Sequence, residues 1–477
     1  MSHFVPVAHG AWGLVWYWVA IAFDGIAVLF AIPAVLARRR EPSVTLAWLL
    51  GLLLLPAVGV ALFLVFGRGN VRRLARPRQR LLAGRRDAAE PADLEAVDLA
   101  IRPLALAAWK AAAAPVRGGN RVGVLINANE AYPAKLAAIE EATRTLDLAY
   151  YIFRPDRTGA LFRDALIAAA RRGVRVRLLL DAVGADRFSG GFFRPLRAAG
   201  AEVRYFLPIS PLRAWTLNLR NHRKILAVDR RIGFTGGINI GDEYLDAGGL
   251  GRWRDTHVRL EGPAVADLAS VFDDDWAYTL GKAPEPPGAL PEPAGESLVQ
   301  ILPSGPEDRG EGIYQIYFAA FASARRTIDI TTPYFIPDQA IAVALVSAAL
   351  RGVRVRLLVP DQNNQRLAAL AARSYFDELL DAGVEIWRYT PGMIHAKTVV
   401  IDGAWASVGT ANMDVRSFRL NFEVNGLLFG GAGTARLAEV FERDLAESDR
   451  LDPGLFRRRS LWWRAAEGGA RLLSPIL

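Results

Sequence analysis

Cysteine is absent from all 477 residues of the chain, and histidine is scarce. Without thiols the chain can form neither a disulfide framework nor a thiolate metal site. Outside two motifs described below the histidines are scattered, which argues against a zinc cluster. We therefore expect a protein that uses no metal and no other cofactor. The five histidines are His3, His9, His222, His257 and His395.

Acidic residues are also fewer than basic ones. The chain has 58 lysines and arginines against 49 acidic residues, which gives a formal net charge of +9 and an isoelectric point near 9.9. Such a balance favours anionic partners, either nucleic acid or anionic lipid, and charge alone does not choose between them.

Charged residues almost disappear from two long apolar stretches near the start. Residues 14–36 carry a single charge, Asp24, and residues 44–66 carry none. Both stretches reach the length of a bilayer core. A central Asp costs about 2.5–3.5 kcal/mol on insertion scales, and the apolar residues of the first stretch return about 4–7 kcal/mol. We expect a transmembrane hairpin over residues 1–66; the alternatives are a pair of buried core helices, or a cleaved signal peptide for the first stretch.

Arginines around these stretches predict the orientation. Residues 38–40 are three arginines, and residues 68–86 contain eight more. The larger cluster places everything after residue 66 in the cytoplasm by the positive-inside rule, although the three loop arginines argue the other way. We expect a multi-pass protein of the bacterial inner membrane with its catalytic domain on the cytoplasmic side. The basic segment suits contact with anionic headgroups, or serves only as a topology signal.

The chemistry-bearing residues occur in two copies of one motif. The lysine follows the histidine by two positions, the aspartate by seven, the glycine by fourteen and the asparagine by seventeen. Residues two apart in a strand point to one face, so each copy presents an imidazole beside a cation. Two such copies suit an anionic phosphodiester far better than a metal. The copies are His222, Lys224, Asp229, Gly236 and Asn239, and His395, Lys397, Asp402, Gly409 and Asn412.

Other landmarks repeat at a similar offset. Gly-Val-Arg-Val-Arg-Leu-Leu begins at Gly173 and again at Gly352, 179 positions later, and the motif histidines lie 173 positions apart. This predicts an α/β protein with two similar halves, each a mixed sheet flanked by helices. We expect the arginines of this repeat to lie at a sheet edge or face solvent. His257 has no lysine two residues on, and we expect it to be structural.

The predicted domain order follows from these landmarks. A helical connector over residues 67–116 is expected to pack under the first half. The halves span residues 117–282 and 297–452, and a proline-rich linker at residues 283–296 separates them. The tail, residues 453–477, mixes arginine with tryptophan and leucine. This composition predicts an amphipathic helix in the membrane interface, or one docked on the protein.

At the motif residues the sequence resembles the phospholipase D superfamily, whose signature His-x-Lys-x4-Asp-x6-Gly-x-x-Asn occurs twice. The N-terminal hydrophobic pair resembles the bacterial cardiolipin synthase branch. Four further stretches do the same: residues 150–153 (Tyr-Tyr-Ile-Phe), 236–244, 253–257 (Trp-Arg-Asp-Thr-His) and 332–338 (Thr-Pro-Tyr-Phe-Ile-Pro-Asp).

A phosphodiester needs its oxygens neutralised, an in-line nucleophile and a proton for the leaving oxygen. Lysines and asparagines suit the first task, one histidine suits the second as a covalent nucleophile, and the other suits the third as general acid. The motifs are symmetric, but the resemblance implies that His222 is the nucleophile, which gives a phosphohistidine, and that His395 is the acid and base.

The resemblance also implies a carboxylate beyond each motif that orients a histidine, and the candidates are Asp255 and Glu423. The catalytic set is thus His222, Lys224, Asp229, His395, Lys397 and Asp402, with Asn239 and Asn412 binding substrate. Of these, Asp229 and Asp402 are expected to organise turns or lysines rather than touch phosphate. Gly237 and Thr410 stand where the family often has serine, so a hydroxyl contact is missing at Gly237.

The resemblance implies transfer of phosphatidyl from one phosphatidylglycerol to another with release of glycerol. The expected partners are phosphatidylglycerol, other anionic phospholipids and the bilayer, and no nucleic acid. The alternatives are a phospholipase D that passes phosphatidyl to water or another alcohol, a nuclease, and a non-catalytic scaffold that binds anionic lipid through its arginines.

Overall fold

The computed structural model describes residues 15, 16, 18, 25, 29, 31–37, 42–66, 78, 93–185, 191–208, 218–245, 249–286, 288–306 and 312–474. The chain divides into two compact units. One contains residues 1–74 and 210–218, and the other contains residues 75–209 and 219–477.

The smaller unit contains helices α2 (Pro42–Leu54) and α3 (Pro56–Phe66). Together these helices cover residues 44–66, the second predicted span, with an interruption at Leu55. The residue before a proline is disfavoured in the α conformation, and Pro56 has no N–H to continue the ladder. A Cβ on Gly59 would lie 2.7 Å from the carbonyl oxygen of Gly51, so this glycine permits close packing at the break.

No helix among the described residues is both long and apolar enough to cross a membrane. The predicted first span, residues 14–36, falls largely outside the described residues. The transmembrane hairpin therefore stays a prediction.

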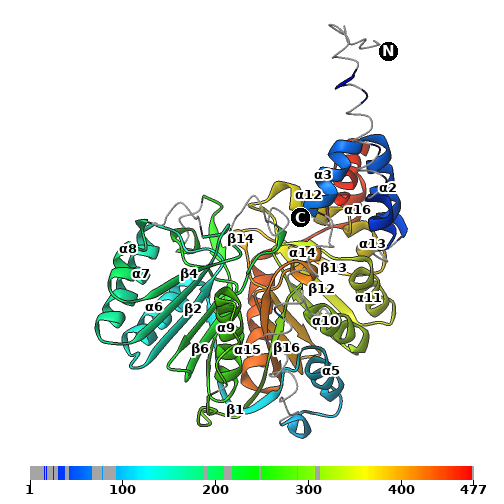
Figure 1. Ribbon diagram of the computed structural model, residues 1–477. Helices are drawn as coiled ribbons and strands as arrows, with labels where there is room; N and C mark the ends of the chain where they lie inside the picture. Colours follow the sequence, from blue (N-terminus) through cyan, green and yellow to red (C-terminus); the bar gives the residue numbers. More distant parts are fainter. Residues whose placement is uncertain are drawn as a thin grey trace. The chain divides into compact units, whose positions relative to one another are not determined.

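The larger unit is built on a mixed sheet of fifteen strands (Figure 1). From the centre outward, the first half contributes β1 (Val116–Ile126), β8 (Thr256–Glu261), β6 (Ile232–Gly236), β5 (Ile225–Val228), β2 (Thr145–Tyr150), β3 (Arg175–Asp181) and β4 (Glu202–Phe206). The second half contributes β9 (Ser297–Ser304), β18 (Glu423–Phe429), β16 (Trp405–Gly409), β15 (Thr398–Ile401), β10 (Thr327–Thr331), β12 (Arg354–Pro360), β13 (Glu385–Tyr389) and β19 (Ser448–Arg450).

The two halves repeat the same strand order around an antiparallel β1–β9 pair at the centre. In each half the three strands β2, β3 and β4, or β10, β12 and β13, run parallel, and the others run antiparallel. The prediction of two similar α/β halves is confirmed. β1 begins at Val116 and β9 at Ser297, whereas the exact domain boundaries stay predictions.

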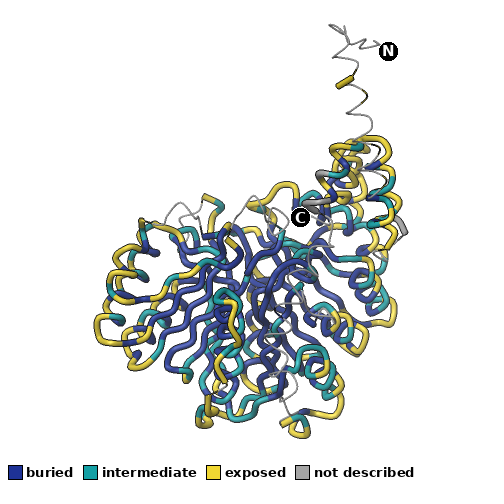
Figure 2. Tube along the Cα trace, in the orientation of Figure 1, coloured by how far each residue is buried: buried dark blue, intermediate teal, exposed yellow. Residues whose placement is uncertain are grey.

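Helices cover the sheet in both halves, and their outer faces are exposed while the strands are buried (Figure 2). The first half carries α6 (Asn127–Glu140), α7 (Arg157–Arg171), α8 (Arg194–Ala198) and α9 (Ala264–Leu280). The second carries α10 (Gly312–Ser323), α11 (Gln339–Leu350), α12 (Arg366–Arg373), α13 (Phe376–Asp381), α14 (Val415–Arg419), α15 (Gly431–Ala446), α16 (Pro453–Arg457) and α17 (Leu461–Arg471).

The duplication extends to helix capping. Asp156 accepts a hydrogen bond from Gly159 N at the start of α7, and Asp338 accepts one from Ile341 N at the start of α11. Each cap satisfies a backbone donor that the first helical turn leaves free.

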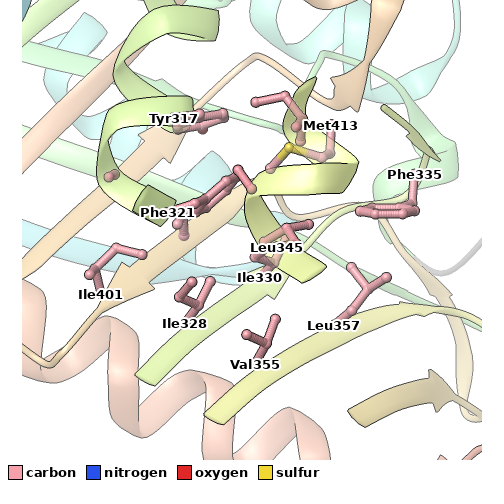
Figure 3. Packing of buried hydrophobic residues seen from close by; sticks show 14 of the residues in the cluster. Tyr317, Phe321, Ile328, Ile330, Phe335, Leu345, Val355, Leu357, Ile401 and Met413 are labelled. Carbon is pink, nitrogen blue, oxygen red and sulfur yellow. The ribbon is translucent and has the colours of Figure 1, made fainter. Parts of the chain in front are cut away.

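The apolar core of the second half lies between α10, α11 and the strands. In this core Phe321 packs near β10 and β15 (Figure 3).

The connector helix α5 (Arg102–Ala112) packs against the second half, so its expected place under the first half is wrong. Leu104 and Ala108 belong to the core cluster that contains α10. Gln300 of β9 donates to the carbonyl oxygens of Ala105, at 3.0 Å, and Ala114, at 2.7 Å. The reason is the central pairing: α5 leads directly into β1, and the neighbour of β1 across the middle of the sheet is β9.

The repeated arginines are only partly as expected. Arg175 and Arg354 are exposed, whereas Arg177 and Arg356 are buried. Arg177 pairs with Asp147 at 2.7 Å, and Arg356 pairs with Asp329 at 2.6 Å. Arg177 and Arg356 lie two residues further along their strands than the exposed pair, where helices cover both faces of the sheet. A buried guanidinium in that position needs a carboxylate partner.

Candidate active site

His222 is positioned by a backbone bridge between the two halves. Its N–H donates to the carbonyl oxygen of Phe422 at 2.9 Å, and Phe422 N donates to Arg220 O at 2.8 Å. The next residue, Glu423, begins β18. Both carboxylate oxygens of Glu423 lie 3.0 Å from His222 Nδ1. A histidine of the first half is thus oriented by a carboxylate of the second.

His395 has the reciprocal arrangement. β14 (Gly392–Ile394) pairs in parallel with β7 (Arg252–Arg254), and His395 N donates to Arg254 O at 2.6 Å. The following residue, Asp255, places Oδ2 2.7 Å from His395 Nδ1. The sequence indicated Asp255 and Glu423 as orienting residues but did not reveal that each would act across the boundary between the halves. Their catalytic roles stay predictions.

The carboxylates fix the tautomer of both rings. A carboxylate only accepts hydrogen bonds, so Nδ1 of each histidine carries the hydrogen and Nε2 keeps its lone pair. Lys224 Nζ donates to His222 O at 2.7 Å, and Lys397 Nζ donates to His395 O at 2.5 Å. Lys397 Nζ also lies 3.1 Å from His395 Nδ1, a contact between two donors in this tautomer. Each motif lysine is therefore held beside its own histidine.

Burial sets the protonation of these groups. Burial lowers the pKa of His222 to about 4, against the opposing charge of Glu423, and lowers the pKa of His395 to about 4 together with the charge of Lys397. Burial also lowers the pKa of Lys224 to about 7 and that of Lys397 to about 8. Both imidazoles are therefore neutral near pH 7, whereas Lys224 is partly and Lys397 mostly protonated there. Removal from water disfavours the charged form of all four groups.

The charges of the two motifs act on one another. Lys397 lowers the pKa of His222, and Lys224 lowers that of His395. Burial would raise the pKa of Glu423, but the charges of His222 and Lys224 hold it below its usual value. The two halves therefore share one electrostatic site, and an anion bound there would relieve the repulsion between its cations.

Glu423 is itself held by polar neighbours. Thr410 Oγ1 donates to Glu423 Oε2 at 2.6 Å, and Asn421 Nδ2 donates to Oε1 at 3.1 Å. The equivalent of Thr410 in the first half is Gly237, where a Cβ would lie only 2.0 Å from Asp255 Oδ1. Asp255 Oδ1 accepts instead from Thr256 N at 2.7 Å. The hydroxyl missing at Gly237 is thus replaced by a backbone donor.

The two motif asparagines differ in their contacts. Asn239 Oδ1 accepts from Ile152 N at 3.2 Å, and its Nδ2 donates to Tyr244 OH at 2.5 Å. Asn412 Oδ1 is buried and has no hydrogen-bond partner within the described part of the chain. Asn412 therefore keeps one acceptor without a partner, whereas the amide of Asn239 is engaged at both its oxygen and its nitrogen. Substrate binding by either asparagine stays a prediction.

The motif aspartates organise turns. Asp229 accepts from the backbone N–H groups of Thr143, Arg144 and Thr145 at 2.7–2.9 Å. Asp402 does the same for residues 325–327 of the second half, at 2.7–2.9 Å. Three backbone donors occupy each carboxylate at the entrance to β2 or β10. These contacts agree with the expectation that Asp229 and Asp402 organise turns, and their place in the catalytic set stays a prediction.

Aromatic rings surround the histidines and received no role from the sequence. The ring centroid of Tyr151 lies 5.1 Å from that of His222. Trp253 and Tyr334 place theirs 5.4 Å and 6.4 Å from that of His395. All three belong to stretches that carry the family resemblance, which was the available signal. Their rings help to exclude water and so strengthen the electrostatic interactions of the site.

A buried lysine of α6 was also missed. Lys135 is 0% exposed, and its Nζ lies 5.4 Å from the ring centroid of Tyr150. Burial lowers its pKa to about 7, against the charge of Asp255. Nζ has no hydrogen-bond partner among the described residues. The only sequence signal was a lysine within an otherwise apolar stretch.

Side chains that could ligate a metal do not cluster in the described ranges. No cluster of three or more histidine, aspartate or glutamate side chains there is placed to hold a metal ion.

Comparisons with known families and proteins agree with this geometry. The model of the family described as "Cardiolipin synthase, PLD-like domain" matches residues 136–276 and 317–445. A second, "Phospholipase_D-nuclease N-terminal", matches residues 25–68. The chain is 40% identical over 462 residues to a cardiolipin synthase of Geobacillus kaustophilus (strain HTA426), covering 94% of this chain and 92% of that one. It is 40% identical over 456 residues to cardiolipin synthase 2 of Bacillus anthracis, covering 92% and 88%.

Among solved structures, the chain is similar to the phosphatidylserine synthase of Haemophilus influenzae Rd KW20. The TM-score is 0.61 with 15% sequence identity, and the match covers 79% of this chain and 100% of that one. At this identity the similarity concerns the fold alone.

Proposed function

The chain belongs to the family of cardiolipin synthases with phospholipase D-like domains, and we propose that it transfers phosphatidyl from one phosphatidylglycerol to another with release of glycerol. The observation that carries this proposal is the crossed pair of histidine and carboxylate contacts, His222 with Glu423 and His395 with Asp255. It supplies two oriented imidazoles to one anionic phosphodiester.

In the first step His222 Nε2 attacks the phosphorus of the donor lipid. A P–N bond forms while the bond from phosphorus to the glycerol oxygen breaks. His395 Nε2–H donates its proton to that oxygen, and glycerol leaves. Resting His395 has a pKa of about 4, so it needs help to carry this proton. The bound phosphodiester brings negative charge next to the imidazole and raises its pKa.

In the second step the headgroup hydroxyl of another phosphatidylglycerol attacks the phosphohistidine. His395 Nε2 accepts the hydroxyl proton, the P–N bond breaks, and cardiolipin leaves. His222 is restored with its lone pair and His395 with its proton. Two in-line displacements give net retention at phosphorus.

Lys224 and Lys397 neutralise the nonbridging oxygens in both steps. Buried lysines with lowered pKa values gain the most from a nearby anion, because the anion stabilises the charged form that burial disfavours. Asn412 donates to these oxygens through its Nδ2–H group, because an amide oxygen only accepts hydrogen bonds. Charge that develops on the pentacoordinate phosphorus is stabilised most strongly where water is excluded.

We propose attachment to the inner membrane of a bacterial cell through the apolar stretches at residues 14–36 and 44–66, with the active-site unit on the cytoplasmic side. The arginines of residues 68–86 support this orientation. Extraction of the protein from cell membranes by alkaline carbonate would argue against the attachment.

The direct test uses the purified full chain in detergent with headgroup-labelled phosphatidylglycerol. Equal amounts of cardiolipin and free glycerol should form without nucleotide and in the presence of a chelator. Phosphatidic acid in place of cardiolipin would favour the hydrolase alternative. A strict requirement for a cytidine-activated lipid would overturn the proposal.

A further inference from the structure

Helix α17 is fixed to the protein by one face. Glu467 is only 1% exposed and accepts from Arg373 Nε at 2.9 Å and from Arg459 Nε at 2.7 Å. Ala470 is buried on the same face, and the guanidinium of Arg471 lies 4.1 Å from the ring centroid of Tyr375. A buried carboxylate shared by two arginines sets the rotation of the helix about its axis.

The opposite face is apolar and open to solvent. Leu461 is 79% exposed, Trp462 86% and Leu472 81%. At 100° per residue Ala465 falls between these side chains, nearly opposite Glu467 on the helix. A single exposed apolar residue needs no explanation, but three large ones on one side of an ordered helix do.

Positive charge borders this face. Arg458 and Arg464 are exposed, and Arg457 is exposed beside its partner Asp381. Tryptophan and leucine with arginine at the margin are typical of helices that lie in the headgroup region of a bilayer. Arginines at that depth gain attraction from anionic lipid.

We propose that the face of α17 formed by Leu461, Trp462 and Leu472 inserts into the interfacial layer of an anionic bilayer and holds the active-site unit against the lipid surface. This inference rests on the proposed function, which requires two lipid substrates. Charge complementarity favours lipid as the occupant over a second copy of this basic chain.

Because the chain has no cysteine, a single introduced cysteine gives a unique label. Trp462→Cys would carry an environment-sensitive fluorophore in the full chain reconstituted into phosphatidylglycerol vesicles. The matched control is Leu350→Cys, at the end of α11, where the native side chain is 74% exposed. Spin-labelled lipids with the nitroxide near the headgroup should quench position 462 and leave position 350 unaffected.

Two outcomes of that experiment would overturn the proposal. Equal quenching at both positions would mean that α17 has no special contact with lipid. A label at position 462 that is shielded from both aqueous and lipid quenchers would mean that protein covers this face, either the helices α2 and α3 or a second copy.

A kinetic test separates docking from chemistry. The double variant Trp462→Ser, Leu472→Ser should lose about tenfold in kcat/KM on phosphatidylglycerol vesicles, which corresponds to about 1.4 kcal/mol. With a short-chain phosphatidylglycerol kept monomeric, its activity should equal that of the parent. Leu350→Ser serves as the control on both substrates.

Equal loss on both substrates would show that the helix acts on the fold or the site instead. Failure of the parent chain to act on any phosphatidylglycerol would contradict the proposed function, while the label at position 462 would still report on bilayer contact.

Discussion

His222 and Glu423 lie 201 positions apart in the chain, yet His222 Nδ1 is 3.0 Å from both oxygens of the Glu423 carboxylate. Asp255 and His395 make the reciprocal contact from the opposite halves. Neither half contains a complete histidine and carboxylate pair of its own. The candidate active site therefore depends on the contacts that hold the halves together, which include the antiparallel β1–β9 pair and the parallel β7–β14 pair.

Removing one carboxylate charge tests this dependence. Glu423→Gln keeps the shape of the side chain but no longer fixes the hydrogen on His222 Nδ1. We expect kcat to fall by about 10²–10⁴-fold, the range associated with loss of an oriented base. Asp255→Asn should behave similarly through His395. Steady-state assays with phosphatidylglycerol measure the effect, and Glu439→Gln, at an exposed position of α15, is the control. Unchanged kcat in both variants would remove the orienting role.

The two histidines can be told apart by the leaving group. If His395 donates a proton to the departing oxygen, His395→Ala should recover activity on a phosphatidyl ester of p-nitrophenol, which leaves without protonation. His222→Ala should remain inactive on the same ester because the nucleophile is gone. Release of p-nitrophenolate is followed by absorbance. Recovery in His222→Ala but not in His395→Ala would reverse the assignment.

Lys135 makes stability depend on pH. Burial lowers its folded pKa to about 7, whereas an unfolded lysine titrates near about 10.4. Between these values the unfolded chain binds a proton that the folded chain has released, so the free energy of unfolding rises with pH from about 7 to about 10. Lys135→Met should unfold at a higher temperature than the parent at pH 7, and the difference should shrink towards pH 10.

Thermal unfolding of the detergent-solubilised chain across this pH range measures the effect. The control is Lys110→Met on α5, because Lys110 is exposed and should leave the pH dependence unchanged. A Lys135→Met variant with the same pH dependence as the parent would contradict a buried amine whose folded pKa is about 7.

Sequence periodicity predicted the duplication and the α/β halves because identical motifs impose identical strands. It could not predict that α5 would pack on the second half, since this follows from how the halves pair. It also placed Arg177 and Arg356 near solvent, because nothing in the local pattern indicates that helices cover both faces of the sheet. The orienting carboxylates were identified by resemblance, but the exchange between halves depends on long-range strand pairing. Lys135 escaped notice because burial of a lone lysine leaves no periodic signal.

The difference between Thr410 and Gly237 gives a last pair of variants. Thr410→Val keeps the volume but removes the hydroxyl that donates to Glu423 Oε2 at 2.6 Å, so kcat should fall by about tenfold, as for loss of one hydrogen bond to a charged group. Thr410→Ser restores the donor and should recover most of the rate.

Gly237→Ser should not raise kcat, although it adds a hydroxyl at the equivalent position of the first half. Its Cβ would lie 2.0 Å from Asp255 Oδ1 and displace the carboxylate from His395. We expect this variant to lose activity while Thr410→Ser retains it. Equal activity of Gly237→Ser and the parent would show that Asp255 can move without cost to the reaction.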